Sequence, residues 1–132
     1  PVGVLVAPVI PALNDWEMER ILDAAVEAGA GNAGYILLRL PHEIKDLMAE
    51  WLEVHAPDRK DHVLSLVRDT RGGKDYDSRF GTRMTGEGPY ATLLRQRFDK
   101  ARVRYGLDGK LPGLRNDLFE APRLESAQMS LF

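Results

Sequence analysis

The chain has 132 residues, of which 44% are hydrophobic, and its formal net charge is −2. That length suits one domain with its own core. No apolar run is long enough for a membrane span, so we expect no membrane partner. The sequence has no cysteine, which excludes disulfides, thiolate nucleophiles and cysteine-ligated zinc or iron–sulfur sites within the chain. With no recognisable secretory leader, we expect a cytoplasmic protein.

The small net charge conceals a segregation along the chain. Residues 1–56 hold 3 Lys or Arg against 9 Asp or Glu, residues 57–106 hold 12 against 7, and residues 107–132 hold 3 against 4. A basic middle between acidic ends indicates either an anionic partner or internal balance between the two regions.

The first third of the chain reads as a strand followed by a helix. Residues 2–10 form a continuous apolar run, typical of a strand covered on both faces in a parallel sheet. Pro8 cannot donate to a strand ladder, so we expect the ladder to end or bulge near it. Asn14 and Glu17 form a capping-box pattern ahead of the helical spacing of Met18–Val26.

The same pattern then repeats and gives way to helices. Residues 33–40 read as a second buried strand, and residues 44–55 as a second amphipathic helix. A third helix begins at Asp58, a long loop spans residues 71–90, and a final helix begins near Pro89. Strand–helix–strand–helix with short connections predicts an α/β unit with parallel strands.

The loop over residues 71–90 is rich in glycine, alternating charges and aromatic rings, and a loop of this length is often functional. Arginine forks there would hold phosphate or carboxylate while Tyr76, Phe80 or Tyr90 stacks on a base. The candidate substrate- or nucleic-acid-binding residues are Arg71, Lys74, Tyr76, Arg79 and Arg83. The alternative is a salt-bridge network with Asp75 and Asp77 that satisfies these charges and pins the loop onto the domain.

The three histidines do not form a metal-ligand spacing, and we predict no metal site. His42 directly follows the second strand, where α/β proteins place ligand contacts. We expect His55 and His62 to be structural or solvent-facing. No Ser/His/Asp nucleophile arrangement and no phosphate-loop motif is present, so catalytic residues stay unknown.

The chain ends in a short apolar motif. It resembles the Gln-Leu-Ser-Leu-Phe pentapeptide by which bacterial replication and repair proteins dock into a pocket of the sliding clamp. The candidate partner-binding residues are Gln128, Met129, Leu131 and Phe132.

Three stretches carry a resemblance to a known family. Residues 4–15, with the turn Ile-Pro-Ala-Leu-Asn-Asp, and residues 34–42 look like the last two strand–helix units of the radical S-adenosylmethionine partial barrel. Residues 71–89 resemble the C-terminal part of a bacterial subfamily grouped with spore photoproduct lyase-like radical proteins. The resemblance implies a parent lyase-like enzyme that binds a [4Fe-4S] cluster through a Cys-x3-Cys-x2-Cys loop and cleaves S-adenosylmethionine to a 5′-deoxyadenosyl radical.

The resemblance also implies an organisation. Residues 1–56 would be the C-terminal part of a partial (β/α)6 barrel, residues 57–106 a mainly helical helix–loop–helix extension, and residues 107–132 a loosely ordered tail. The loop and its following helix would lie beyond the barrel, covering its opening or receiving substrate, with DNA as the substrate by analogy. The adenosyl side of the cofactor would be lined by Val9, Ile10, Pro11, Leu40, Pro41 and His42.

The missing cysteines depart from the family pattern. The chain would then be a C-terminal fragment that is inactive alone and binds no cofactor by itself. Its main partner would be the missing N-terminal part of the same protein, and exposed strand edges favour self-association. The alternative is a non-enzymatic module that binds nucleic acid or a sliding clamp.

Overall fold

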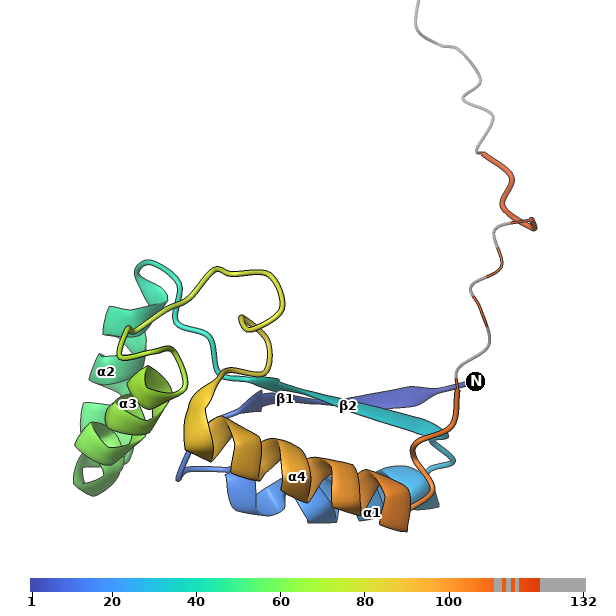
Figure 1. Ribbon diagram of the computed structural model, residues 1–132, viewed down its shortest axis with the longest axis horizontal. Coiled ribbons are helices and arrows are strands. Elements are labelled where there is room, and N and C mark those ends of the chain that lie inside the picture. Colours follow the sequence, from blue (N-terminus) through green and yellow to red (C-terminus); the bar gives the residue numbers. More distant parts are fainter. Residues whose placement is uncertain (111–112, 114, 116, 122–132) are drawn as a thin grey trace, which may run out of the picture.

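The computed structural model describes residues 1–110, 113, 115 and 117–121 (Figure 1). Over these residues the chain is a mixed α/β structure with two parallel strands and four α-helices. The strands are β1 (Gly3–Val9) and β2 (Asn32–Leu37), and the helices are α1 (Met18–Glu27), α2 (Ile44–His55), α3 (Lys60–Asp69) and α4 (Gly88–Arg104). No helix within the described part is both long and apolar enough to cross a bilayer.

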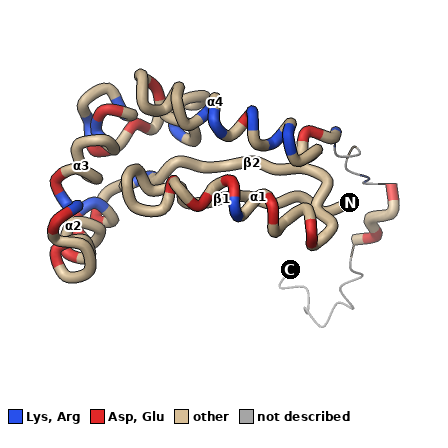
Figure 2. Tube along the Cα trace, turned by 90° about the horizontal axis from the view of Figure 1, so that it is seen from below, with Lys and Arg blue, Asp and Glu red and all other residues tan. Residues whose placement is uncertain are grey.

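The two strands pair in parallel, with α1 as the connection between them. Val4 lies opposite Ala33 and Val6 opposite Tyr35, but the next pair joins Val9 to Leu37. β1 therefore carries one extra residue at Ala7–Pro8, which confirms the bulge expected from a proline without an amide proton. In both views α1 and α4 lie along the strands, whereas α2 and α3 lie beyond one end of them (Figure 1 and Figure 2).

The predicted capping box at Asn14 is wrong. The Asn14 side chain accepts a hydrogen bond from the Ile10 amide (2.6 Å) and donates one to the Pro8 carbonyl (3.1 Å). A short 3₁₀ turn, Asp15–Glu17, lies between Asn14 and α1. The side chain is thus consumed by the turn that leaves β1 and is not available to the first amides of the helix.

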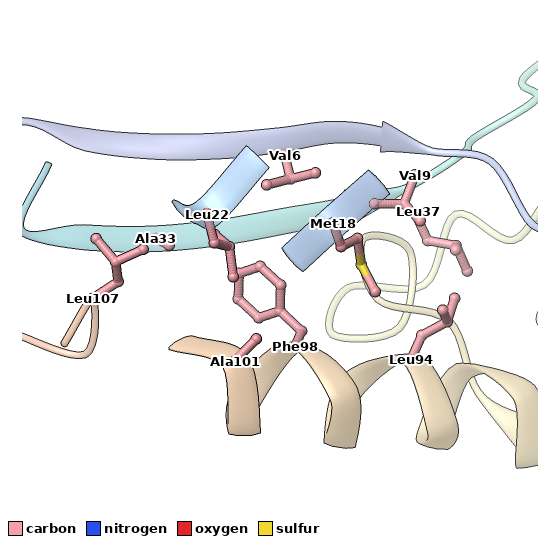
Figure 3. Close-up of a cluster of buried hydrophobic side chains, with 10 residues drawn as sticks. All are labelled: Val6, Val9, Met18, Leu22, Ala33, Leu37, Leu94, Phe98, Ala101 and Leu107. Atoms are coloured by element: carbon pink, nitrogen blue, oxygen red, sulfur yellow. The ribbon is translucent and has the colours of Figure 1, made fainter. Parts of the chain in front are cut away.

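The first core cluster joins one face of the sheet to both helices that run along it (Figure 3). Phe98 is 3% exposed and its ring lies 4.7 Å from that of Tyr35. The cluster consists of Val6, Val9, Ala33 and Leu37 from the strands, Met18 and Leu22 from α1, Leu94, Phe98 and Ala101 from α4, and Leu107. Because its apolar stripe needs a partner, α4 returns to the sheet beside α1, unlike the expectation that this helix would lie beyond the barrel.

The second core cluster lies past the ends of the strands. β2 ends at Leu37 and not at residue 40 as predicted, because the chain turns there and buries Leu38 and Leu40 against α2 and α3. The cluster comprises Leu38, Leu40, Leu52, Val63, Leu64 and Val67. The two helices therefore form a second layer next to the C-terminal ends of both strands.

Candidate functional site

The C-terminal ends of β1 and β2 lie at the same end of the sheet. The connection from α3 to α4 folds back onto this end. We call residues 70–87 of this connection the strand-end loop. The Leu37 amide donates to the Met84 carbonyl (2.8 Å), and the Glu87 amide donates to the Thr70 carbonyl (3.0 Å). The loop is thus closed at its base and bonded to the last residue of β2.

Arg71 anchors the strand-end loop from within. Its side chain is buried, and its guanidinium donates to the carbonyls of Leu38 (2.9 Å), Thr82 (3.0 Å) and, at a longer 3.5 Å, Leu37. Burial lowers the pKa of Arg71. A guanidinium that is turned inward and already bonded to three carbonyls does not face a ligand in solution.

Arg79 is also engaged within the loop. It donates to both Asp77 (2.8 Å to Oδ2) and Glu87 (2.7 Å to Oε1). The hydrogen bonds from the Arg79 side chain and amide lower the pKa of Asp77 to about 2. This pairing matches the salt-bridge alternative stated for the loop.

Some of the other loop side chains have hydrogen-bond or ion-pair partners within the chain, and others do not. Asp75 accepts a hydrogen bond from Arg68 (2.7 Å), and this bond is the main reason that the pKa of Asp75 is lowered. The Asp75 carboxylate also lies 3.4 Å from the Lys45 ammonium. The Tyr76 hydroxyl accepts from Arg39 (3.0 Å). Among the predicted cations, Lys74 and Arg83 have no ion pair within the described part of the chain, with Lys74 exposed and Arg83 half-buried.

The six residues expected to line a cofactor lie at the strand ends, but half of them face inward. Val9 and Leu40 are 1% and 2% exposed, and Pro11 is also buried. Ile10 and Pro41 are half-buried, and His42 is exposed. Val9 belongs to the first core cluster and Leu40 to the second, so only Ile10, Pro41 and His42 present side-chain surface to a ligand.

Comparison with family models, with curated proteins and with solved structures finds no match to the chain. Any assignment of function therefore depends on this geometry and on the residues themselves.

The residues present do not fit an iron–sulfur cluster. The sequence contains no cysteine to ligate one. Within the described residues no group of three or more His, Asp or Glu side chains is placed to hold a metal ion. All three histidines are exposed, and His55 lies against Trp51 with ring centroids 4.9 Å apart.

α4 is rich in basic residues, with five cations and one acid (Figure 2). Arg97 donates to Glu19 of α1 (2.9 Å) and lies 3.7 Å from Asp15 in the turn before α1. The remaining cations of this helix have no ion pair among the described residues, and they are Arg95, Lys100, Arg102 and Arg104.

Arg39 is a site residue that the sequence reasoning missed. Besides its bond to Tyr76, its guanidinium lies 5.7 Å from the centre of the Tyr76 ring, and its buried Nε has no partner among the described residues. The signal was available, because Arg39 is the only charged residue in the apolar stretch from residue 33 to residue 41.

The clamp-motif candidates Gln128, Met129, Leu131 and Phe132 lie outside the described residues.

Gly86 is expected to tolerate no side chain. Its φ is +73°, and an added Cβ would lie 3.0 Å from Leu37 Cδ2 and 3.1 Å from the Thr70 carbonyl oxygen. We expect Gly86→Ala to lower the free energy of unfolding by about 2 kcal/mol in urea titrations. Gly106→Ala is the matched control, because φ is +67° there but no atom lies within 4 Å. Equal losses in the two variants would contradict the tight packing at Gly86.

Tyr90 links α4 to the turn after β1. Its hydroxyl donates to Asp15 (2.8 Å) and accepts from the Ala12 amide (3.4 Å). Burial and the Asp15 carboxylate raise the pKa of Tyr90 to about 12.

This raised pKa predicts a loss of stability in alkali. Because the folded pKa of Tyr90 lies above the ordinary value of 10.0, the unfolded chain releases the proton first. The contribution of the Tyr90 hydroxyl to the free energy of unfolding is therefore complete below pH 10 and declines as the pH rises towards 12. Tyr90→Phe should cost about 1 kcal/mol at neutral pH and show a shallower decline. Tyr105→Phe is the control at neutral pH, where it should cost less than Tyr90→Phe, which removes two hydrogen bonds.

Proposed function

We propose that this chain supplies the last two strands of a larger parallel β/α barrel and one wall of the cofactor pocket of a radical S-adenosylmethionine enzyme. The enzyme class rests on the resemblance of residues 4–15, 34–42 and 71–89. The observation that carries the proposal of an incomplete barrel is the difference between the two edges of the sheet.

The outer edge of β2 is covered. The Ala33 amide donates to the Leu107 carbonyl (3.0 Å), and Asn32 forms an antiparallel bridge with Asp108. At the other end of the strand, Leu37 bonds to Met84. These contacts leave β2 protected in the manner of a terminal strand.

The outer edge of β1 is open. Within the described residues β1 pairs only with β2. β1 also has no charged residue, so it lacks the side chains with which exposed edge strands resist pairing. This asymmetry supports a sheet that continues past β1 and ends at β2.

One face of the sheet also lacks a cover. Leu5 is 58% exposed, Ala7 and Pro8 are exposed, and Ile36 on β2 is half-buried. α1 and α4 lie on the opposite face (Figure 1). In a barrel, the uncovered apolar face would point to the interior and the helices would form the outer ring.

The chain's own contribution to such an enzyme is binding and support. Ile10, Pro41 and His42 would contact the adenosyl part of S-adenosylmethionine. Their chain neighbours Val9 and Leu40 fix this part of the backbone by packing in the two core clusters. Bound S-adenosylmethionine and the cluster would supply the radical chemistry. The cluster ligands must come from another part of the protein, because this chain has no cysteine.

Sequencing the reading frame upstream of Pro1 tests the proposal directly. We expect a three-cysteine cluster motif preceded and followed by further strand–helix units. In hydrogen exchange, the β1 amides that do not donate to β2 should gain protection when that upstream part is present, whereas amides of β2 should change little. A frame that begins immediately before Pro1, together with equal protection of both strands in the chain alone, would refute it.

A further inference from the structure

Phe80 stands out on the strand-end loop. At 89% exposure it is the most exposed of the large hydrophobic side chains described. Its neighbours in the sequence, Ser78, Arg79, Gly81 and Thr82, carry no large apolar side chain. In Figure 1 the loop projects from the strand ends away from α1 and α4.

The backbone around Phe80 is held in place. Arg79 is bonded to Asp77 and Glu87, and its carbonyl accepts from the Arg83 amide (3.1 Å). The Thr82 carbonyl accepts from the buried Arg71. These bonds on both sides of Phe80 hold the segment that presents the ring to solvent.

Arg83 completes a stacked pair with this ring. Its guanidinium carbon lies 4.4 Å from the ring centre, in cation–π geometry. The nearby carboxylates of Asp77 and Glu87 are already bonded to Arg79. Arg83 therefore keeps its positive charge unpaired while most of the phenyl surface stays open.

We propose that Phe80 and Arg83 form a stacking site for an unpaired base of single-stranded nucleic acid. The base lies on the open surface of the phenyl ring, and Arg83 contacts the adjoining phosphate. This function goes beyond the barrel role proposed above and does not require the rest of an enzyme.

The chemistry of the pair selects this ligand over other classes. A protein or lipid surface would require a contiguous apolar patch, and the polar neighbours of Phe80 provide none. In a duplex the faces of the bases are already stacked, whereas a single strand offers them to aromatic side chains. A nucleotide also brings the negative charge that Arg83 and Lys74 lack as partners within the described residues.

Fluorescence anisotropy with labelled oligonucleotides tests the site on the intact chain. The probes are oligo-dT and oligo-U of about 12 nucleotides and a duplex of the same length. We expect Phe80→Ala to weaken binding of at least one single strand about tenfold and Phe80→Trp to restore it. Phe119→Ala is the matched control, because Phe119 is also exposed (75%) but lies far along the chain. Arg83→Gln should reduce the slope of log K against log salt by about 0.7.

Phe80→Ala should keep the wild-type melting temperature, because the ring contributes almost no buried surface. A loss of binding can then be assigned to the site and not to unfolding. The proposal is overturned if neither single strand binds at low salt, if the duplex binds as tightly as the single strands, or if Phe80→Ala binds no more weakly than Phe119→Ala. Stronger binding of either DNA or RNA supports the same stacking chemistry and identifies the preferred sugar.

Discussion

Arg71→Ala is expected to lower the free energy of unfolding by about 3 kcal/mol. The two short hydrogen bonds from the guanidinium reach Leu38, the residue after β2, and Thr82 in the strand-end loop. Hydrogen bonds from a charged donor contribute about 1.5–3 kcal/mol each. Releasing a charge from a buried position offsets part of that loss, as the lowered pKa of Arg71 indicates. The Leu38 carbonyl then loses its donor, whereas the Thr82 carbonyl keeps a hydrogen bond from the Gly86 amide (2.7 Å).

Urea denaturation with related variants separates the bonds from the volume of the side chain. Arg71→Met keeps much of the volume but donates no hydrogen bond, so it should be nearly as damaging as alanine. Arg71→Lys keeps the charge with a different donor geometry and should be intermediate. Arg68→Ala, which removes a solvent-exposed ion pair with Asp75, should cost no more than about 1 kcal/mol. Equal losses from Arg68→Ala and Arg71→Ala would contradict the anchoring role.

The position of Arg71 also affects how binding data should be interpreted. From the sequence, Arg71 belonged with the loop cations as a ligand-binding candidate. Because its removal destabilises the loop that carries Phe80 and Arg83, Arg71→Ala should weaken nucleic-acid binding without any contact to the ligand. Substitutions at Phe80 and Arg83 are the informative ones.

The regular elements were largely readable from periodicity and turn residues. The apolar run of β1, the bulge at Pro8 and the amphipathic spacing of α2 and α4 are local properties of the sequence. The parallel pairing of the strands also followed from the short strand–helix–strand connection. A local pattern shows that a helix buries one side, but not which partner covers it. The docking of α4 beside α1 could not be predicted for this reason.

The candidate site was harder to predict because its bonds connect distant residues. Arg71 donates to the carbonyls of Leu38 and Leu37, which lie 33 and 34 residues earlier in the chain. No local sequence pattern predicts such a pairing. A cation next to two glycines looks solvent-facing in the sequence. Similarly, the second strand was predicted to run to residue 40 but ends at Leu37, because Leu38 and Leu40 pack against α2 and α3, which no local pattern indicates.

Phe98→Ala should be the most damaging single truncation in the first core cluster, with an expected loss of about 3–5 kcal/mol. Phe98 is 3% exposed and joins α4 to both strands and to α1 (Figure 3). Removing the ring takes away its contact with Tyr35 and leaves a cavity that the sheet and the helices cannot readily close. Leu93→Ala on the same helix is the control, because Leu93 is 51% exposed and should change stability by no more than about 0.5 kcal/mol.

The form of the unfolding transition then reports how the two core clusters are coupled. The chain leaves the sheet at Val9–Ile10 and at Leu37–Leu38, and each of these steps passes directly from the first cluster to the second. Arg71 and the Met84 carbonyl tie the same point to the strand-end loop. Phe98→Ala should therefore lower the urea midpoint in a single transition with an unchanged m-value. A separate transition for α2 and α3 would show instead that the second cluster folds independently of the sheet.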